Sequence, residues 1–134
     1  MSAEPLVVDT DVASLLRSGR LPAHLYRIAR DHFLLITPIT LGEALKGAYK
    51  AGWSRGRLFD LLIYYERVFS LLMWDSAIPT AYGMIAGLNL RRGITVGDND
   101  IWISAWCLAH QIPLMSMNRR HFEPLRRFGL ELVP

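Results

Sequence analysis

The stretch VVDTDV (residues 7–12), near the start of the chain, joins an apolar run to two carboxylates. Residues 6–8 are apolar and β-prone, so they predict a short buried strand that ends at Asp9. The amphipathic residues 12–17, followed by a glycine at position 19, predict a helix. A strand that leads almost directly into a helix is typical of an open α/β sheet, whose ligand sites lie beyond the carboxyl ends of the strands.

Short apolar runs alternate with helical patterns along the rest of the chain. Further strands are expected at residues 33–36, 71–74, 114–116 and 130–133, and further helices at 22–31, 41–50, 57–70, 77–90 and 99–110. The strands are continuously apolar rather than alternating, which is typical of strands covered on both faces. The pattern therefore predicts one α/β domain, residues 1–134, with a parallel sheet between helical layers.

Composition limits the classes to which the protein can belong. The chain has 134 residues, of which 51% are hydrophobic and 20% charged, so it is expected to fold around a core rather than stay disordered. Cys107 is the single cysteine, which excludes an internal disulfide and a cysteine-based zinc site. No apolar run approaches the ~20 residues of a membrane span, and the first residues lack the pattern of a signal peptide. The expected location is the cytoplasm, with no membrane contact.

Nearly all of the basic residues are arginine. Of the fifteen Lys and Arg residues only Lys46 and Lys50 are lysine, and thirteen are arginine. Arginine binds phosphate bidentately and stacks on bases, whereas lysine acts as a point charge. With a pI near 9.4, this balance favours a polyanionic partner, although a solvated basic surface has the same composition.

Five of the twelve acids stand where strands are expected to end. Asp9 and Asp11 follow the first strand, Glu43 follows the second after a short turn, and Asp98 and Asp100 begin a late helix. If the sheet is parallel with its first strand central, these carboxylates meet at one edge, where each close pair repels by about 4 kcal/mol. A divalent cation removes that repulsion, and an all-oxygen ligand set suits Mg²⁺ or Mn²⁺ better than zinc.

Each acid also has a purely structural interpretation. Asp9 can start a turn, Asp11 can cap the helix that begins at residue 12, and Asp98 can cap the late helix with Asp100 in its first turn. The four histidines, His24, His32, His110 and His121, show no paired spacing for a metal and are interpreted as surface or packing residues.

The order of these motifs resembles a known family. The chain has D-T-D at 9–11, T-L-G-E at 40–43, D-I-W-I-S-A at 100–105, and S-M-N at 116–118 followed by Phe122. This order resembles the PIN domains, and more specifically the VapC-type toxins of prokaryotic toxin–antitoxin operons. The resemblance covers nearly the whole chain. It implies a three-layer α/β/α domain whose parallel sheet has four to five short strands in the order 3-2-1-4-5.

The same resemblance implies a Mg²⁺-dependent endoribonuclease, with Mn²⁺ as an alternative ion, in which a metal-activated water attacks the RNA phosphodiester. It assigns the catalytic and metal-binding acids to Asp9, Glu43 and Asp100. The fourth position, often acidic in the family, is Asn118, so a second ion would be held less firmly. Asp98 is a further candidate ligand that would replace some of the missing charge.

Several neighbours of these acids are expected to support the site. Asp11 would orient Asp9 or add ligation, and Thr10 and Ser116 would form hydrogen bonds within the cluster, while Thr40 is either a supporting residue or a turn residue. The residues first expected to contact RNA phosphates are Arg119 and Arg120, which directly follow Asn118.

The chain is also expected to bind other proteins. The dense apolar stretch around Tyr65, Phe69 and Leu72 exceeds what one helix–sheet contact needs. Family resemblance implies two uses for such surface: a homodimer, and burial under a cognate VapB-like antitoxin.

Two alternatives remain open at this point. VVDTDV is also similar to the strand-end signature of HAD-type phosphotransferases, in which Asp9 would be the nucleophile, but the chain is short for that fold and Glu43 would have no role. The third interpretation is a non-catalytic PIN module that binds RNA or a protein partner, and Asn118 keeps it open.

Overall fold

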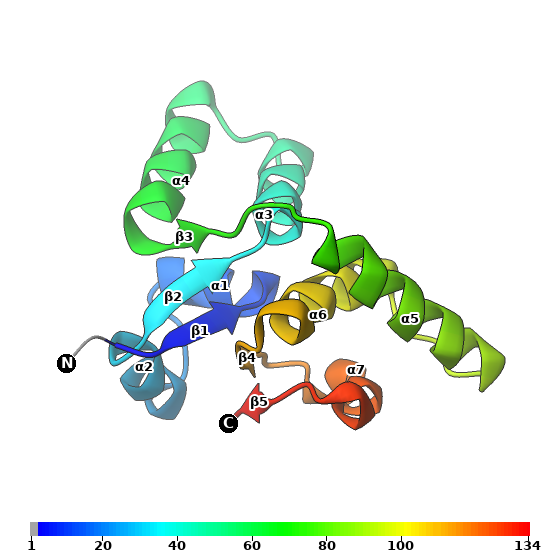
Figure 1. The fold of residues 1–134 in the computed structure, drawn as a ribbon. Helices are drawn as coiled ribbons and strands as arrows, with labels where there is room; N and C mark the ends of the chain where they lie inside the picture. Colours follow the sequence, from blue (N-terminus) through cyan, green and yellow to red (C-terminus); the bar gives the residue numbers. More distant parts are fainter. Residues whose placement is uncertain (1–2) are drawn as a thin grey trace.

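A computed structural model describes residues 3–134 (Figure 1). The strands are β1 (Pro5–Val8), β2 (Phe33–Ile36), β3 (Ser70–Leu71), β4 (Leu114–Met115) and β5 (Leu132–Val133). The helices are α1 (Thr10–Arg17), α2 (Ala23–Arg30), α3 (Pro38–Lys50), α4 (Arg55–Val68), α5 (Ala77–Arg91), α6 (Asp98–His110), α7 (Arg119–Phe122) and the 3₁₀ helix η1 (Glu123–Phe128). The sheet order is β3-β2-β1-β4-β5 and every pairing is parallel, which confirms the predicted order.

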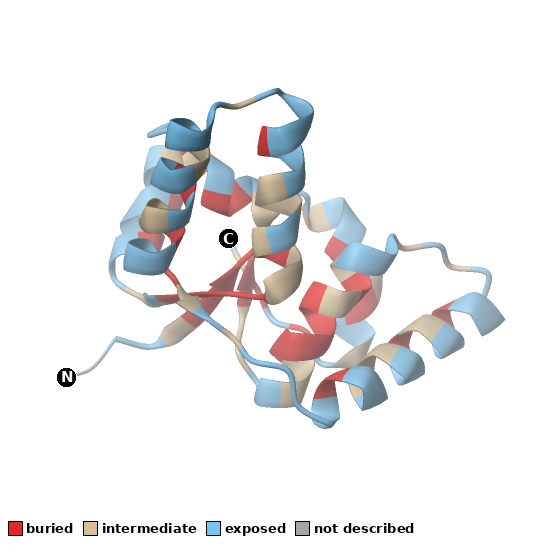
Figure 2. Cartoon of the chain, turned by 90° about the horizontal axis from the view of Figure 1, so that it is seen from above, coloured by how far each residue is buried: buried red, intermediate tan, exposed pale blue. Residues whose placement is uncertain are grey.

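Successive residues of the central strand β1 supply opposite faces of the sheet. Leu6 and Val8 belong to an apolar cluster with residues of α1, α2, α3 and α4, whereas Val7 belongs to a second cluster with residues of α5, α6, α7 and η1. All three side chains are completely buried. The buried positions therefore gather around the sheet between two helical layers (Figure 2), as the continuously apolar strands predicted.

The edge strand β3 is shorter than the predicted strand at residues 71–74. It pairs with β2 only through Ser70 and Leu71. Beyond them the Leu72 N–H still donates to the Ile36 carbonyl at 2.8 Å, and then the chain turns away. The reason is a tertiary contact: Trp74 packs on Trp106 with ring centroids 4.4 Å apart, and the Trp106 indole N–H donates to the Met73 carbonyl.

The segment between the last two strands contains more structure than expected. Residues 119–128 form α7 and η1, where the sequence pattern predicts no element. Four residues are too few to show a helical period, so α7 leaves no signal that could be detected in the sequence. The strands at 114–116 and 130–133 are also shorter than predicted, at two residues each.

No helix within residues 3–134 combines the length and the apolar character that crossing a bilayer requires.

Candidate active site

The predicted acids lie on segments that meet at the carboxyl edge of the sheet. Asp9 directly follows β1, Glu43 lies in the second turn of α3, which follows β2, and Asp100 lies in the first turn of α6. Ser116 and Asn118 follow β4, the neighbour of β1. Parallel strands present their carboxyl ends on one side, so the sheet order places these segments side by side (Figure 1).

Asp9 is the buried member of the group, with 5% of its surface exposed. It is the N-cap of α1, since its Oδ1 accepts a hydrogen bond from the Val12 N–H at 2.9 Å. The cap is therefore Asp9 and not Asp11, contrary to the structural alternative for Asp11. Asp9 lies outside the helix in extended backbone, where a side-chain oxygen reaches the free N–H groups of the first turn.

Burial raises the pKa of Asp9 from 3.8 to about 6. Hydrogen bonds from Ser116 and from the Val12 N–H oppose this change, and the negative charges of Asp11 and Asp100 add to it. The hydrogen bond from Ser116 agrees with the supporting role expected for that residue. The carboxylate is thus desolvated and repelled, and no basic side chain is among the causes of the shift.

Glu43 is held by donors from two other elements. Its Oε1 accepts a hydrogen bond from the Thr10 hydroxyl, and its Oε2 accepts one from the Asn99 amide at 3.2 Å. The Thr10 bond agrees with the prediction that this hydroxyl supports the cluster. Asn99 was missed, although it lies within the GDND segment (residues 97–100).

Asp100 faces α7. The His121 Nδ1 lies 3.2 Å from its Oδ2. Burial raises the pKa of Asp100, the contact with His121 lowers it, and the charges of Glu43 and Asp11 raise it. These mutual effects mean that the four carboxylates lie close enough to share one electrostatic environment.

Asp98 points elsewhere. It does not cap α6, because the N-cap is Gly97 and Asp98 is already the first helical residue. Its Oδ1 instead accepts a hydrogen bond from the Tyr82 hydroxyl of α5 at 2.8 Å. The predicted cap is therefore wrong. Gly97 has the extended backbone of an N-cap residue, with φ −60° and ψ 142°.

Asn118 forms a hydrogen bond with the acidic group. Its side-chain amide donates to Asp11 Oδ2 at 2.6 Å, and its backbone N–H donates to the Ser116 hydroxyl at 2.9 Å. Thr40 is fully buried inside α3, with its N–H donating to the Thr37 hydroxyl at 3.2 Å. Thr37 is the N-cap of that helix, so Thr40 is a helical residue and not a turn residue.

The oxygen-rich donor set has the chemistry of a hard divalent cation. As placed, however, no three His, Cys, Asp or Glu side chains within residues 3–134 lie close enough to enclose a metal ion. The reason is that the carboxylates face internal donors: Glu43 faces Thr10 and Asn99, and Asp100 faces His121. The charge and chemistry of the group fit a divalent cation, and its side chains are occupied by hydrogen-bonding partners within the chain.

Basic side chains border this edge on α7. A cavity of about 610 Å³ is lined by residues 117–121, including Arg119 and Arg120. Arg120 also lines a neighbouring cavity of about 250 Å³ together with Asp100 and His121. Arg119 has a long contact of 3.8 Å with Glu123, and its Nη1 is buried with no hydrogen-bond partner in the described part of the chain. Arg120 is exposed, so its guanidinium is the donor beside the acids that an anionic ligand can reach.

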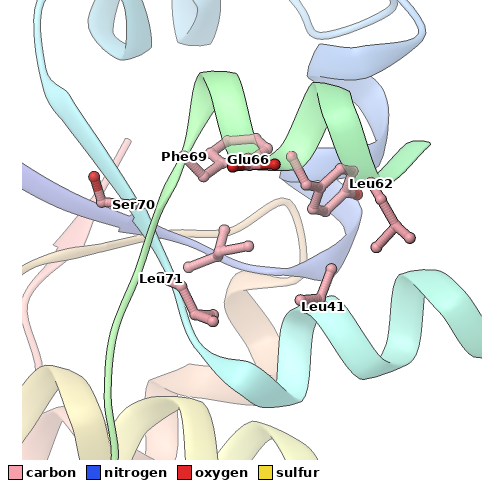
Figure 3. A pocket seen from close by; sticks show the side chains of 8 residues that line it. Leu41, Leu62, Glu66, Phe69, Ser70 and Leu71 are labelled. Carbon is pink, nitrogen blue, oxygen red and sulfur yellow. The ribbon is translucent and has the colours of Figure 1, made fainter. Parts of the chain in front are cut away.

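A separate apolar groove lies between α3 and α4, beside the edge strand (Figure 3). Its volume is about 630 Å³, and its walls include Leu41, Leu62 and Leu71. Glu66 is the one charged residue among those that line it. Leu62 and Leu71 are each more than two-fifths exposed, so apolar surface is open to solvent here.

The sequence is similar to curated ribonucleases along its length. It is 25% identical to "Ribonuclease VapC" of Rickettsia bellii over 131 residues, covering 96% of both chains. It is 27% identical to "Ribonuclease VapC1" of Methanocaldococcus jannaschii over 97 residues, covering 72% of this chain and 68% of that relative. No protein-family model matches the chain.

Solved structures share the fold. VapBC-1 from nontypeable Haemophilus influenzae superposes with a TM-score of 0.82 at 22% identity, covering 96% of each chain. The chain therefore shares the fold of the VapBC structures and is similar in sequence to VapC ribonucleases. VapBC2 from Rickettsia felis, bound to a promoter DNA fragment, superposes on this chain with a TM-score of 0.78 at 19% identity, covering 96% of this chain and 97% of that one.

Two residues that the sequence pattern did not single out as part of the site contact the predicted acids. Asn99 contacts Glu43, and His121 contacts Asp100. His121 is exposed, as expected, with 63% of its side chain accessible, but it is not isolated from the site. Asn99 could have been found from its position next to Asp100, whereas His121 could not, because α7 has no sequence signal.

Proposed function

We propose that this protein is a PIN-domain, Mg²⁺-dependent endoribonuclease that acts in the cytoplasm as the toxin of a type II toxin–antitoxin pair. The observation that carries the proposal is the shared electrostatic environment of Asp9, Asp11, Glu43 and Asp100 at the carboxyl edge of the sheet. Relatives named ribonuclease and neighbours that are VapBC complexes support it.

The ion would be held by Asp9, Glu43 and Asp100, with Asn118 and Asp11 beside them. When bound, Mg²⁺ stabilises charge on the scissile phosphate and lowers the pKa of water. The chain's own residues prepare the site: Ser116 orients Asp9, and Thr10 orients Glu43. Burial of Asp9 excludes water from one side of the cluster, which strengthens its attraction for a cation.

Arg119 and Arg120 would bind RNA phosphates at the rim. They line a cavity next to the acids, and arginine contacts phosphate bidentately. We expect an Arg119→Ala/Arg120→Ala variant to bind RNA more weakly. The slope of log affinity against log salt concentration should fall by the amount that one to two phosphate contacts contribute. Filter binding at several salt concentrations measures this. An unchanged salt slope would contradict the contact.

The central test is to incubate the purified protein with total RNA, with Mg²⁺ or with EDTA, and to map the new ends. Cleavage is expected only with the ion, and it should be lost in Asp9→Asn and Glu43→Gln. A HAD-type phosphotransferase would tolerate Glu43→Gln and keep Asp9 as nucleophile. RNA binding without cleavage would instead support the non-catalytic alternative.

We further propose that the apolar groove between α3 and α4 receives the antitoxin. The groove exposes leucines, and Glu66 is the one acid among its lining residues. These features favour binding of an antitoxin segment that is apolar and carries a basic residue opposite Glu66. Leu62→Glu should abolish antitoxin binding, measured by calorimetry, and leave RNA cleavage intact. Tight binding by that variant would contradict the proposal.

A homodimer is the second assembly that we propose. Met84, Leu88 and Leu90 of α5 are exposed apolar side chains, and they favour burial against a second copy. Light scattering should report about twice the 15.2 kDa chain mass, and a Leu88→Glu variant should report the chain mass alone.

A further inference from the structure

The carboxylate of Glu43 is clamped from two sides. Thr10, at the start of α1, donates to one oxygen, and Asn99, at the start of α6, donates to the other. The three residues come from three different elements and are far apart in the sequence. A carboxylate bonded through both oxygens loses rotational freedom about its last side-chain torsion, so the clamp fixes the direction of its remaining lone pairs.

Asn99 is suited to this task because its side chain is uncharged. The amide nitrogen is the donor here, since an ionised carboxylate only accepts hydrogen bonds. A lysine or arginine in its place would neutralise Glu43 and compete with a cation. The amide orients Glu43 and leaves its negative charge available.

The position of Asn99 in the chain adds a second argument. Asn99 precedes Asp100, so the first turn of α6 carries both the acid and the residue that holds Glu43. Asp100 and Glu43 repel each other, since the charge of Glu43 raises the pKa of Asp100. Without a fixed contact the flexible Glu43 side chain would swing away from that charge. The Asn99 bond keeps the two carboxylates together.

We propose that Asn99 is a positioning residue for the metal site, acting through Glu43. The role rests on the proposed function, because it presumes that Glu43 binds a divalent cation. Asn99 itself is exposed and lies at the surface of the helix. Its removal is therefore expected to disturb the site more than the fold.

The test measures Mn²⁺ binding to the full chain by electron paramagnetic resonance, without substrate. Asn99→Ala should weaken Mn²⁺ affinity by about tenfold, as removal of a residue that orients a ligand typically does. Asn99→Gln, which keeps the amide, should recover part of the affinity. The melting temperature without ions should stay at the wild-type value, and RNA cleavage by Asn99→Ala should recover at about tenfold higher Mg²⁺.

A double-mutant cycle separates action through Glu43 from a general effect. In a Glu43→Gln background, Asn99→Ala should change Mn²⁺ affinity no further. An equal loss in both backgrounds, or a wild-type affinity in Asn99→Ala, would overturn this role and leave the proposed function standing. A wild-type chain that binds no Mn²⁺ would overturn the metal site itself, and the role of Asn99 with it.

Discussion

Asp9 has two functions that conflict at the level of a single residue. It caps α1, and it is a desolvated carboxylate beside other acids. Raising its pKa from 3.8 to about 6 corresponds to about 3 kcal/mol of destabilisation at neutral pH, where the unfolded chain would keep it ionised. A structural cap alone does not require a buried charge, because asparagine caps helices equally well.

The first prediction follows from this conflict. Asp9→Asn should keep the hydrogen bond to the Val12 N–H and remove the buried charge. We expect the free energy of unfolding without ions to rise by up to about 3 kcal/mol. The melting temperature should rise by roughly 3–5 °C for each kcal/mol gained. Scanning calorimetry at pH 7 measures this, and RNA cleavage should be lost. A lower melting temperature would mean that the ionised carboxylate stabilises the fold.

The second prediction concerns pH. Since the folded pKa of Asp9 is raised, the folded chain binds more protons than the unfolded chain between about pH 3.8 and 6. The contribution of Asp9 to the stability of the ion-free fold should therefore be most favourable below pH 3.8 and be lost as the pH rises through 6. Cation binding should change in the opposite direction and weaken as the pH falls through 6.

Mn²⁺ affinity and melting temperature measured from about pH 3 to 8 test these opposite trends. In Asp9→Asn the stability trend assigned to Asp9 should disappear, which separates it from the titration of the histidines. An acid limb of Mn²⁺ binding centred near pH 4 would contradict the raised pKa.

At the scale of elements, the first turn of α6 organises the edge of the sheet. Its three polar residues face three neighbours: Asp98 bonds Tyr82 of α5, Asn99 bonds Glu43 of α3, and Asp100 contacts His121 of α7. Consecutive helical residues lie about 100° apart, so one turn presents side chains in three directions. The turn thereby connects α3 and α7 at the acidic site and binds α5 through a separate contact.

The third prediction tests which of these contacts is only structural. Tyr82→Phe removes the hydroxyl that bonds Asp98 and keeps the ring that stacks on Trp102 at 3.9 Å. We expect a loss of about 0.5–1 kcal/mol in the free energy of unfolding and an unchanged Mn²⁺ affinity. Urea denaturation and resonance titration measure the two quantities. Mn²⁺ affinity reduced tenfold would return Asp98 to the candidate ligands.

At the scale of the whole molecule, the carboxylates of the acidic cluster repel one another, and a bound cation would reduce that repulsion. An ion that binds only the folded chain raises the free energy of unfolding by about 2.7 kcal/mol at one hundred times its dissociation constant. The fourth prediction is therefore that Mg²⁺ or Mn²⁺ raises the melting temperature and that EDTA reverses the change.

Asp9→Asn is the matched control for this cation effect, because asparagine can keep the capping bond while the carboxylate proposed to bind the ion is removed. Its melting temperature should respond far less to either ion. Spermine at equal charge concentration distinguishes a specific metal site from general screening of the negative charges. Equal stabilisation of the wild type and of Asp9→Asn would contradict a site that includes Asp9.

Much of the architecture was predictable because it depends on local patterns. The apolar runs at β1 and β2 and the helical periods of α4, α5 and α6 placed the main elements within two residues or so of their observed bounds. The order of the acids along the chain, together with the parallel sheet, placed Asp9, Glu43 and Asp100 at one edge. The elements need only hydrophobic periodicity, and the shared edge needs the rule that parallel strands end on one side, whereas the central place of β1 was implied by the resemblance of the motif order to the PIN domains.

The tertiary structure alone decided which polar atoms meet. Three contacts depend on helix positions that are set by packing on the sheet. They are the hydrogen bond of Asn99 to Glu43, the contact of His121 with Asp100, and the hydrogen bond of Tyr82 to Asp98. The short strand β3 and the helix α7 likewise follow from contacts such as that of Trp74 with Trp106. A sequence determines the local period of burial, but side-chain contacts between distant segments exist only once the core has brought those segments together.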